Sequence, residues 1–190
     1  MILYLHGFRS GPQSQKVQAL ATRMAQRGLA AGFWCEQLSP VPLEAIALVE
    51  ACIARCPTPP TLVGSSLGGF YATHLAEKHG LRAVVINPFV PYADFDQALF
   101  IGEHEMIYSP QRFHFTDAHA AQIAVLDTPR LSRPENFWLL AEAGDEVLDY
   151  HHALTRYAAC RQTVLPGGDH SFTRWEDYLD AVIAFAGLAE

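Results

Sequence analysis

Short apolar segments alternate with amphipathic segments along this chain, and this order limits the possible folds more than any other feature. The apolar segments predict strands at Ile2–Leu5, Leu29–Trp34, Thr61–Val63, Ala83–Ile86, Phe137–Ala141 and Gln162–Leu165. The amphipathic segments predict helices at Ser14–Arg27, Leu43–Cys56, Leu67–His79 and Asp149–Ala159, and a closing helix that begins at a capping box from Thr173 to Glu176. Strands that alternate with helices in this way indicate βαβ units and a parallel sheet.

The predicted strands are apolar throughout, which is typical of a sheet with both faces covered. We therefore expect an α/β fold, a mainly parallel sheet of about six strands flanked by helices, in one domain over residues 1–190. From Phe89 to Glu135 the pattern lapses into aromatic, histidine and proline residues, with one helix-like piece near Ala118–Leu126. This stretch is too long for an ordinary connection, so we expect a small lid-like insertion at about 89–135.

The composition excludes some classes of function. The net charge is −7, from 13 basic and 20 acidic residues, and no basic block occurs, so binding to nucleic acid or to an anionic membrane surface is not expected. The sequence begins directly with an apolar strand pattern and shows neither a signal peptide nor a transmembrane segment, which favours a cytoplasmic location. The histidines and cysteines have no metal-ligand spacing, and we expect neither a metal nor another cofactor.

A glycine-rich turn joins the third predicted strand to the helix that follows it. Gly64-Ser65-Ser66-Leu67-Gly68 fits the pattern G-x-S-x-G, in which a serine stands on a tight strand-to-helix turn with its hydroxyl exposed. The glycines two residues before and after Ser66 leave room for such a turn. Ser66 is therefore the predicted nucleophile, and Ser65 is the alternative. No nucleotide-binding glycine pattern is present.

A serine needs a base, and the base needs an orienting acid. In chains with this turn, the acid and then the histidine follow the serine, each in a loop after a strand. Asp145 follows the fifth predicted strand and His170 follows the sixth, which makes them the candidate acid and base. Asp94 and Asp96, after the fourth strand, are rival acids. Weaker candidates are Glu146, Asp149 and Asp169.

Two backbone N–H groups would have to stabilise the oxyanion of an acyl-transfer intermediate. The residue after the nucleophile supplies one, which is Leu67 here. The loop after the first strand supplies the other. In the loop Leu5-His6-Gly7-Phe8, Gly7 permits a close approach of the backbone, so the N–H of Phe8 is the second candidate. His6 is expected to brace this loop.

Several motifs together resemble those of the α/β-hydrolase superfamily and, more narrowly, the small YqiA-type bacterial esterases. They are L-Y-L-H-G-F-R-S-G-P-Q-S-Q-K (3–16), V-G-S-S-L-G-G-F-Y-A-T (63–73), V-V-I-N-P (84–88), W-L-L-A-E-A-G-D-E-V-L-D-Y (138–150) and Y-A-A-C-R-Q-T-V-L-P-G-G-D-H-S-F (157–172). The resemblance implies a compact α/β-hydrolase whose sheet lacks the first two strands of larger members. It also implies Ser66 as nucleophile, Asp145 as acid and His170 as base, and hydrolysis of acyl esters or thioesters.

The sequence thus predicts a serine esterase that acts on a small-molecule acyl ester or thioester. A thioesterase acting on acyl-CoA is the alternative enzyme, with Arg9 and Lys16 as the nearest basic residues for the CoA phosphates. A hydrolase-fold binding protein with a misaligned triad is the alternative outside enzymes. The oligomeric state stays open. Candidate residues for an apolar acyl pocket are Phe89, Phe95, Phe113 and Phe115, and ordinary packing in the lid or the core is the alternative for each of them.

Overall fold

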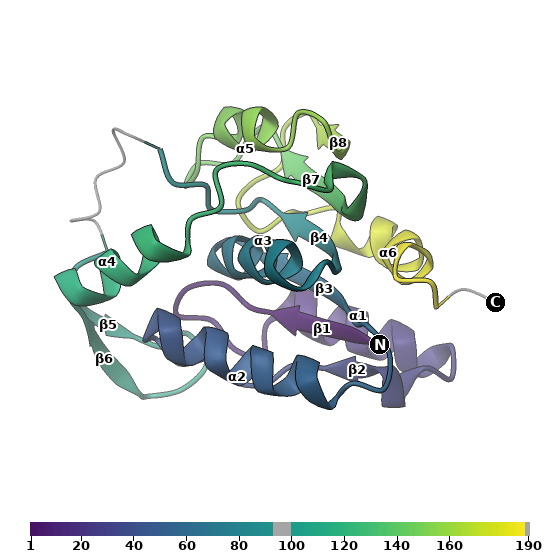
Figure 1. Cartoon of the computed structure of the whole chain (residues 1–190), viewed down its shortest axis with the longest axis horizontal. Coiled ribbons are helices and arrows are strands. Elements are labelled where there is room, and N and C mark those ends of the chain that lie inside the picture. The colour runs from purple at the N-terminus through teal and green to yellow at the C-terminus, as the bar shows by residue number, and fades with distance from the viewer. Residues whose placement is uncertain (93–99, 189–190) are drawn as a thin grey trace.

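The structure, a computed structural model, describes residues 1–92 and 100–188. Its main sheet has six strands in the order β2-β1-β3-β4-β7-β8, and every neighbouring pair is parallel (Figure 1). These strands are β1 (Ile2–Leu5), β2 (Phe33–Trp34), β3 (Thr61–Ser65), β4 (Arg82–Ile86), β7 (Phe137–Glu142) and β8 (Arg161–Leu165). The mainly parallel sheet expected from the alternating pattern is therefore confirmed.

Helices cover both faces of the sheet. In Figure 1, α2 (Pro42–Arg55) and α3 (Leu67–His79) lie in front of the strands, and α1 (Gln15–Gln26) and α6 (Leu179–Phe185) lie behind them. The short helix α5 (Tyr150–Arg156) connects β7 to β8. This arrangement buries the sheet between two layers of helices, as the apolar strand sequences require.

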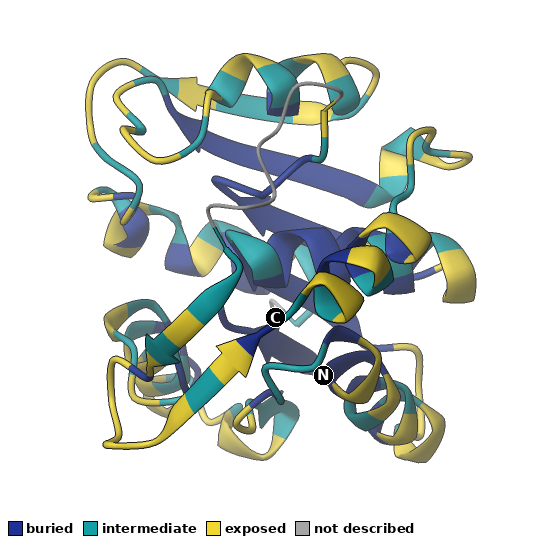
Figure 2. Ribbon diagram, turned by 90° about the vertical axis from the view of Figure 1, so that its left-hand side faces the viewer, coloured by how far each residue is buried: buried dark blue, intermediate teal, exposed yellow. Residues whose placement is uncertain are grey.

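The core has one cluster on each face, and alternate residues of the four inner strands β1, β3, β4 and β7 contribute to each. Leu3 and Leu5 of β1 belong to the cluster under α2 and α3, and Ile2 and Tyr4 belong to the cluster under α1 and α6. All four β1 side chains are at most 1% exposed, and the inner strands of the sheet are coloured as buried in Figure 2.

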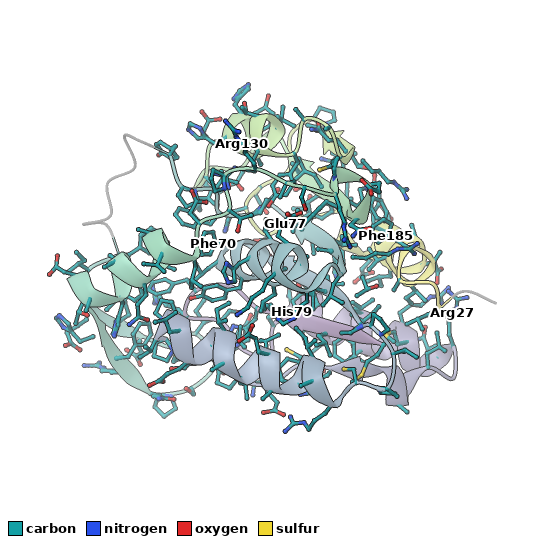
Figure 3. The ribbon with its side chains drawn as sticks, viewed as in Figure 1. Arg27, Phe70, Glu77, His79, Arg130 and Phe185 are labelled. Atoms are coloured by element: carbon teal, nitrogen blue, oxygen red, sulfur yellow. The ribbon has the colours of Figure 1, made fainter. Side chains whose placement is uncertain are left out.

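Two aromatic side chains labelled in Figure 3 show how the helices meet these faces. Phe70 on α3 packs its ring against Phe89, with the ring centroids 5.7 Å apart. Phe185 on α6 packs against Trp138 of β7 at 5.7 Å on the other face. The ring on α6 thus packs on strand β7, and the ring on α3 packs on the chain that follows β4.

Two local predictions are wrong. The second strand is not Leu29–Trp34: residues Ala30–Gly32 form a 3₁₀ turn, and only Phe33–Trp34 pairs with β1. Gly28 ends α1 with a positive φ of 71°, and Gly32 N–H then donates to the Leu29 carbonyl at 2.8 Å, so residues 29–32 form a turn.

The capping box at Thr173 is also absent. The Thr173 hydroxyl donates to the Glu142 carboxylate, and the chain continues through a 3₁₀ helix, Trp175–Tyr178, that has no side-chain cap. The hydroxyl is bonded to a buried carboxylate, and a hydrogen bond to a charged group is stronger than a neutral one.

The insertion between β4 and β7 holds structure that the sequence did not reveal. It contains an antiparallel hairpin of β5 (Gly102–Glu105) and β6 (Arg112–Phe115), followed by α4 (Asp117–Leu126). Only α4 was predicted. The hairpin strands are polar and partly exposed, so they lack the apolar pattern by which the sheet strands were found. The assignment of the whole chain to one domain stays a prediction.

Candidate active site

The carboxyl ends of the parallel strands meet at one edge of the sheet, where the candidate residues converge. The loop after β1 carries Gly7 and Phe8, the turn after β3 carries Ser66, the loop after β7 carries Asp145, and the loop after β8 carries His170. In open parallel sheets this edge is the usual place for a ligand site.

Ser66 stands on a sharp turn between β3 and α3. Its backbone has a φ of 56° and a ψ of −123°, a conformation that non-glycine residues adopt rarely and at a cost. The turn is held by neighbouring backbone groups: Ser66 N–H donates to the Ile86 carbonyl at 3.0 Å, and the Ser66 carbonyl accepts from Gly69 N–H at 2.9 Å and Phe89 N–H at 3.0 Å. Strain of this kind, held by its surroundings, is typical of functional positions.

The glycines of the motif are required by the close packing of this turn. A Cβ at Gly64 would overlap the Gly68 carbonyl oxygen, and a Cβ at Gly68 would overlap the carbonyl oxygen of Leu5. The turn and the start of α3 therefore press directly against β1.

Gly68→Ala should lower the free energy of unfolding by about 3 kcal/mol, because the methyl group would collide with backbone atoms that cannot rotate away. Urea titration of the folded protein measures this change. Gly32→Ala is the matched control, since the atom nearest to its added Cβ is Met24 Cε at 3.7 Å. Equal urea midpoints for the two variants would contradict the close packing of α3 against β1.

Ser66, His170 and Asp145 form a continuous chain of hydrogen bonds. His170 Nε2 lies 3.1 Å from Ser66 Oγ, and His170 Nδ1 lies 2.8 Å from Asp145 Oδ2 and 3.0 Å from Oδ1. A carboxylate can only accept hydrogen bonds, so the ring proton is on Nδ1 and Nε2 is left to accept from the serine hydroxyl. The Asp145 side chain is 2% exposed and that of His170 22%.

The Asp145 carboxylate is itself fixed by the backbone. Its Oδ1 accepts from Val147 N–H at 2.9 Å and from Leu148 N–H at 2.8 Å. These amides hold the carboxylate in the orientation that meets the imidazole.

The structure separates these residues from most of their rivals. Ser65 is buried at the end of β3. Asp149 caps α5 through His151 N–H, and Asp169 Oδ1 accepts from Ser171 N–H. Glu146 reaches the same loop, where its carboxylate accepts from His170 N–H at 3.0 Å. The rival acids Asp94 and Asp96 lie outside the described residues.

The loop after β1 approaches Ser66 closely. A Cβ at Gly7 would stand 3.2 Å from both the Ser65 carbonyl oxygen and Ser66 Cβ, so only glycine fits without displacing the elbow. Leu67 is the first residue of α3, where N–H groups have no partner within the helix. Phe8 and Leu67 line the same cavity as Ser66 and His170.

His6 braces this loop, as the sequence predicts. Its Nε2 accepts from Leu38 N–H at 2.9 Å, so its Nδ1 carries the proton and donates to the Gly7 carbonyl at 3.0 Å. Burial lowers the pKa of His6, which keeps the ring neutral. In a trans peptide the carbonyl and the N–H point in opposite directions. The bond to Gly7 therefore turns the N–H of Phe8 away from His6.

The ring of Phe8 is surrounded by aromatic rings of the insertion. Its centroid lies 4.9–5.6 Å from four of them, all nearly perpendicular to it, namely Phe100, His104, Phe113 and Phe115. Arg9 forms two hydrogen bonds with the hairpin segment. Its Nε donates to the Glu105 carbonyl at 2.9 Å, and its backbone carbonyl accepts from Ile107 N–H at 2.8 Å. The insertion thus supports the loop after β1.

A cavity of about 490 Å³ opens beside Ser66 and His170. Most of its wall is apolar and comes from the insertion and from the loop after β7; its lining includes Phe89, Pro91, Phe100, Phe115, Ala120, Ile123 and Leu148. Of the phenylalanines proposed for a pocket, Phe89 and Phe115 line this cavity. Phe113 instead packs on Phe8, and Phe95 lies outside the described residues.

Sequence reasoning missed two polar residues beside this site, Asn87 and Glu142. Asn87 follows β4 and Glu142 ends β7, and both side chains contact the backbone of the loop that carries His170. The motifs V-V-I-N-P and L-L-A-E-A-G-D contain them, and a polar residue at the buried end of an apolar strand was the available signal.

A parallel six-stranded sheet that presents a serine elbow after β3, with an acid after β7 and a histidine after β8, defines the α/β-hydrolase fold. Within that class, residues 1–187 match the model of the Uncharacterised protein family UPF0227, and the chain belongs to this family. The resemblance to the α/β-hydrolase, YqiA-type family is thereby confirmed.

Solved structures show the same fold. The chain superposes on a monoacylglycerol lipase from Paleococcus ferrophilus with a TM-score of 0.73 at 12% identity, over 99% of this chain and 94% of the lipase. The mouse alpha/beta hydrolase domain-containing protein 10 gives 0.69 at 17% identity, over 96% and 89%. Est1E from Butyrivibrio proteoclasticus, with ferulic acid bound, gives 0.65 at 14% identity, over 97% and 86%. At these identities the likeness establishes the fold.

Residues 1–92 and 100–188 contain neither a metal-binding cluster nor a membrane-spanning helix. Within these ranges no three side chains of metal-binding type cluster closely enough to hold an ion. No helix in the same ranges combines the length and the hydrophobicity needed to cross a bilayer.

Proposed function

We propose that this protein is a serine hydrolase that cleaves acyl esters through an acyl-enzyme. The observation that carries the proposal is the chain of hydrogen bonds from Ser66 through His170 to Asp145, which ends beside an apolar cavity. A hydroxyl, a neutral imidazole nitrogen and a buried carboxylate in this order are what nucleophilic acyl transfer requires.

In the proposed mechanism, His170 Nε2 takes the proton of Ser66 as Ser66 Oγ bonds to the acyl carbon. The carbonyl oxygen becomes an oxyanion that accepts from the N–H groups of Phe8 and Leu67. His170 then returns the proton to the leaving alkoxide. Water repeats the sequence against the acyl-enzyme, which releases the carboxylic acid and restores Ser66. Asp145 keeps the imidazole tautomer and stabilises the imidazolium that forms.

The cavity supports an apolar acyl group as the part of the substrate that is bound. Aromatic and aliphatic side chains of the insertion form most of its wall, and burial of each methylene of an acyl chain contributes about 0.8 kcal/mol. The basic residues considered for an acyl-CoA substrate give less support, because the Lys16 ammonium is already bonded to the Ser171 carbonyl at 2.7 Å. A binding protein with a misaligned triad would not need the hydrogen-bonded geometry seen here.

Labelling with a fluorophosphonate followed by peptide mapping tests this function. We expect an adduct on Ser66, and hydrolysis of p-nitrophenyl esters in a panel that also holds a feruloyl ester and acyl-CoAs of matched chain length. An adduct on Ser65 would contradict the assignment of the nucleophile. The absence of both labelling and turnover would favour a binding protein, and turnover of acyl-CoAs alone would favour the thioesterase.

Ala124→Trp should shift the acyl preference toward short chains. Ala124 lines the cavity from α4, so an indole there would occupy space for the distal acyl carbons. We expect kcat/KM for a decanoyl ester to fall about 10- to 100-fold, and that for an acetyl ester to change by less than about threefold. Steady-state kinetics with both esters measure the shift.

Val125→Trp is the matched control for this variant. Val125 is the next residue of α4, is 77% exposed and does not line the cavity. An equal loss for decanoyl and acetyl esters in Ala124→Trp, or the same shift in Val125→Trp, would contradict the placement of the acyl chain in this cavity.

A further inference from the structure

Two buried polar side chains at the site take no part in the proposed chemistry. Asn87 follows β4 and is 3% exposed, and Glu142 ends β7 and is fully buried. A buried carboxylate and a buried amide are costly unless they are fully hydrogen-bonded. Both side chains form hydrogen bonds with the loop between β8 and the 3₁₀ helix Trp175–Tyr178, which carries His170.

Glu142 binds the loop on both sides of His170. Its Oε2 accepts from Asp169 N–H at 2.9 Å and from Thr173 N–H at 2.9 Å. Its Oε1 accepts from the guanidinium Nε of Arg174 at 2.8 Å. Burial raises the pKa of Glu142, but the bonds from Arg174, Asp169 and Thr173 outweigh burial and hold its pKa below the ordinary value. The carboxylate is therefore ionised at neutral pH.

Asn87 binds backbone carbonyl groups of the same loop. Its Nδ2 donates to the Asp169 carbonyl at 3.0 Å and to the His170 carbonyl at 3.2 Å, while its Oδ1 accepts from Glu142 N–H at 2.9 Å. Ile86, the residue before Asn87, is hydrogen-bonded to the serine turn, because its carbonyl accepts from Ser66 N–H. A short path of hydrogen bonds thus joins the serine elbow to the histidine loop.

One glycine of the loop, Gly168, leaves space for the carboxylate. Gly167 and Gly168 have φ values of 67° and 73°, and a Cβ at Gly168 would overlap the Glu142 carboxylate. The loop has no helix or strand of its own at these residues. Besides a backbone bond from Gly144 N–H to the Gly167 carbonyl, its shape therefore depends on the side chains that bind it, with Glu146 at the His170 N–H among them.

We propose that Glu142 and Asn87 are positioning residues that hold the backbone around His170, so that Nε2 stays within hydrogen-bond distance of Ser66 Oγ. The inference rests on the proposed function. Asp145 orients the imidazole ring, but one hydrogen bond to Nδ1 does not fix the distance between the loop and the elbow, which lie on different strands. Glu142 and Asn87 supply that constraint from β7 and β4.

Glu142→Gln tests the role of the carboxylate. A carboxamide has one oxygen, so its NH₂ would face either the loop N–H groups or Arg174 Nε, a donor against a donor. We expect kcat for a p-nitrophenyl ester to fall about 10- to 100-fold, as for a small misplacement of a catalytic group, with KM within about threefold. The downfield ¹H NMR signal of the His170 Nδ1 proton should shift or broaden; its loss in His170→Ala assigns it.

Glu50→Gln is the matched control, because Glu50 is also paired with a cation, Lys78, but lies on α2. It should keep both the wild-type kcat and the NMR signal. Asn87→Gly is the second variant: glycine accepts the φ of 39° at this position and removes only the side-chain bonds. It should lower kcat about tenfold and alter the same signal.

The outcomes separate this inference from the proposed function. The positioning role is overturned if Glu142→Gln and Asn87→Gly fold, keep the wild-type kcat and leave the Nδ1 signal unchanged. The activity of the wild type would still support the proposed function in that case. If the wild type neither labels nor turns over esters, the proposed function fails. The NMR signal alone then decides the positioning role: a change in both variants supports it, and no change overturns it.

Discussion

Ser66→Ala should lower kcat for ester hydrolysis by about 10⁶-fold and abolish labelling by a fluorophosphonate. The change removes the one oxygen that lies 3.1 Å from His170 Nε2, and no covalent intermediate can then form. Because the turn keeps its glycines and its backbone hydrogen bonds, the urea midpoint should stay close to that of the wild type. The measurement is steady-state turnover of a p-nitrophenyl ester together with mass spectrometry of the labelled protein.

Ser65→Ala is the matched control for Ser66→Ala. It removes a hydroxyl from the adjacent residue, which is buried at the end of β3, and should keep kcat within about threefold of the wild type. Loss of labelling in Ser65→Ala with retention in Ser66→Ala would reverse the assignment of the nucleophile.

Asp145→Asn should lower kcat by about 10⁴-fold without unfolding the protein. The asparagine oxygen can still accept from Val147 and Leu148 N–H, as Oδ1 does now. Its NH₂ group would then face Nδ1 of His170 and favour the tautomer with the proton on Nε2. That nitrogen would no longer accept the serine proton, so labelling of Ser66 should slow in parallel with turnover.

Asp149→Asn is the comparison that isolates the effect of Asp145. Asp149 is a nearby carboxylate that caps α5, and an asparagine caps a helix about as well. We expect its kcat to match the wild type. A kcat for Asp145→Asn within tenfold of the wild type would remove Asp145 from the mechanism and direct attention to Asp94 and Asp96.

Most of the main sheet could be predicted because its inner strands are buried on both faces. A segment such as Phe137–Ala141 must be apolar at every position, since its alternate side chains enter two separate clusters, and few other structures require this pattern in so short a segment. The edge strand was harder to place. Of the predicted segment Leu29–Trp34, only Phe33 and Trp34 pair with β1, and the residues before them form a turn.

The hairpin of the insertion escaped prediction for the opposite reason. Its cross-strand pairs join polar or half-exposed residues, such as Glu105 with Arg112 and Glu103 with His114. Its stability comes from rings that contact Phe8, which lies about a hundred residues away in sequence. A local pattern cannot record such a contact.

The candidate site was partly predictable for a chemical reason. Ser66, Asp145 and His170 occupy loops that follow strands in the order expected for this chemistry, and the structure brings these three side chains into contact. Asn87 and Glu142 were missed because their roles depend on where the loop after β8 returns. Only the three-dimensional structure shows that the Glu142 carboxylate and the Asn87 amide both bond to the backbone of this loop.

The support of Phe8 by the insertion has a consequence for the engineering of this protein. The hairpin carries rings that hold Phe8, and one of them, Phe115, also forms part of the cavity wall. Exchange of the insertion for that of a relative would therefore alter turnover as well as selectivity. A functional chimera would need an insertion whose side chains pack around the Phe8 ring as the present ones do. Otherwise Phe8 would have to be replaced together with the transplanted segment.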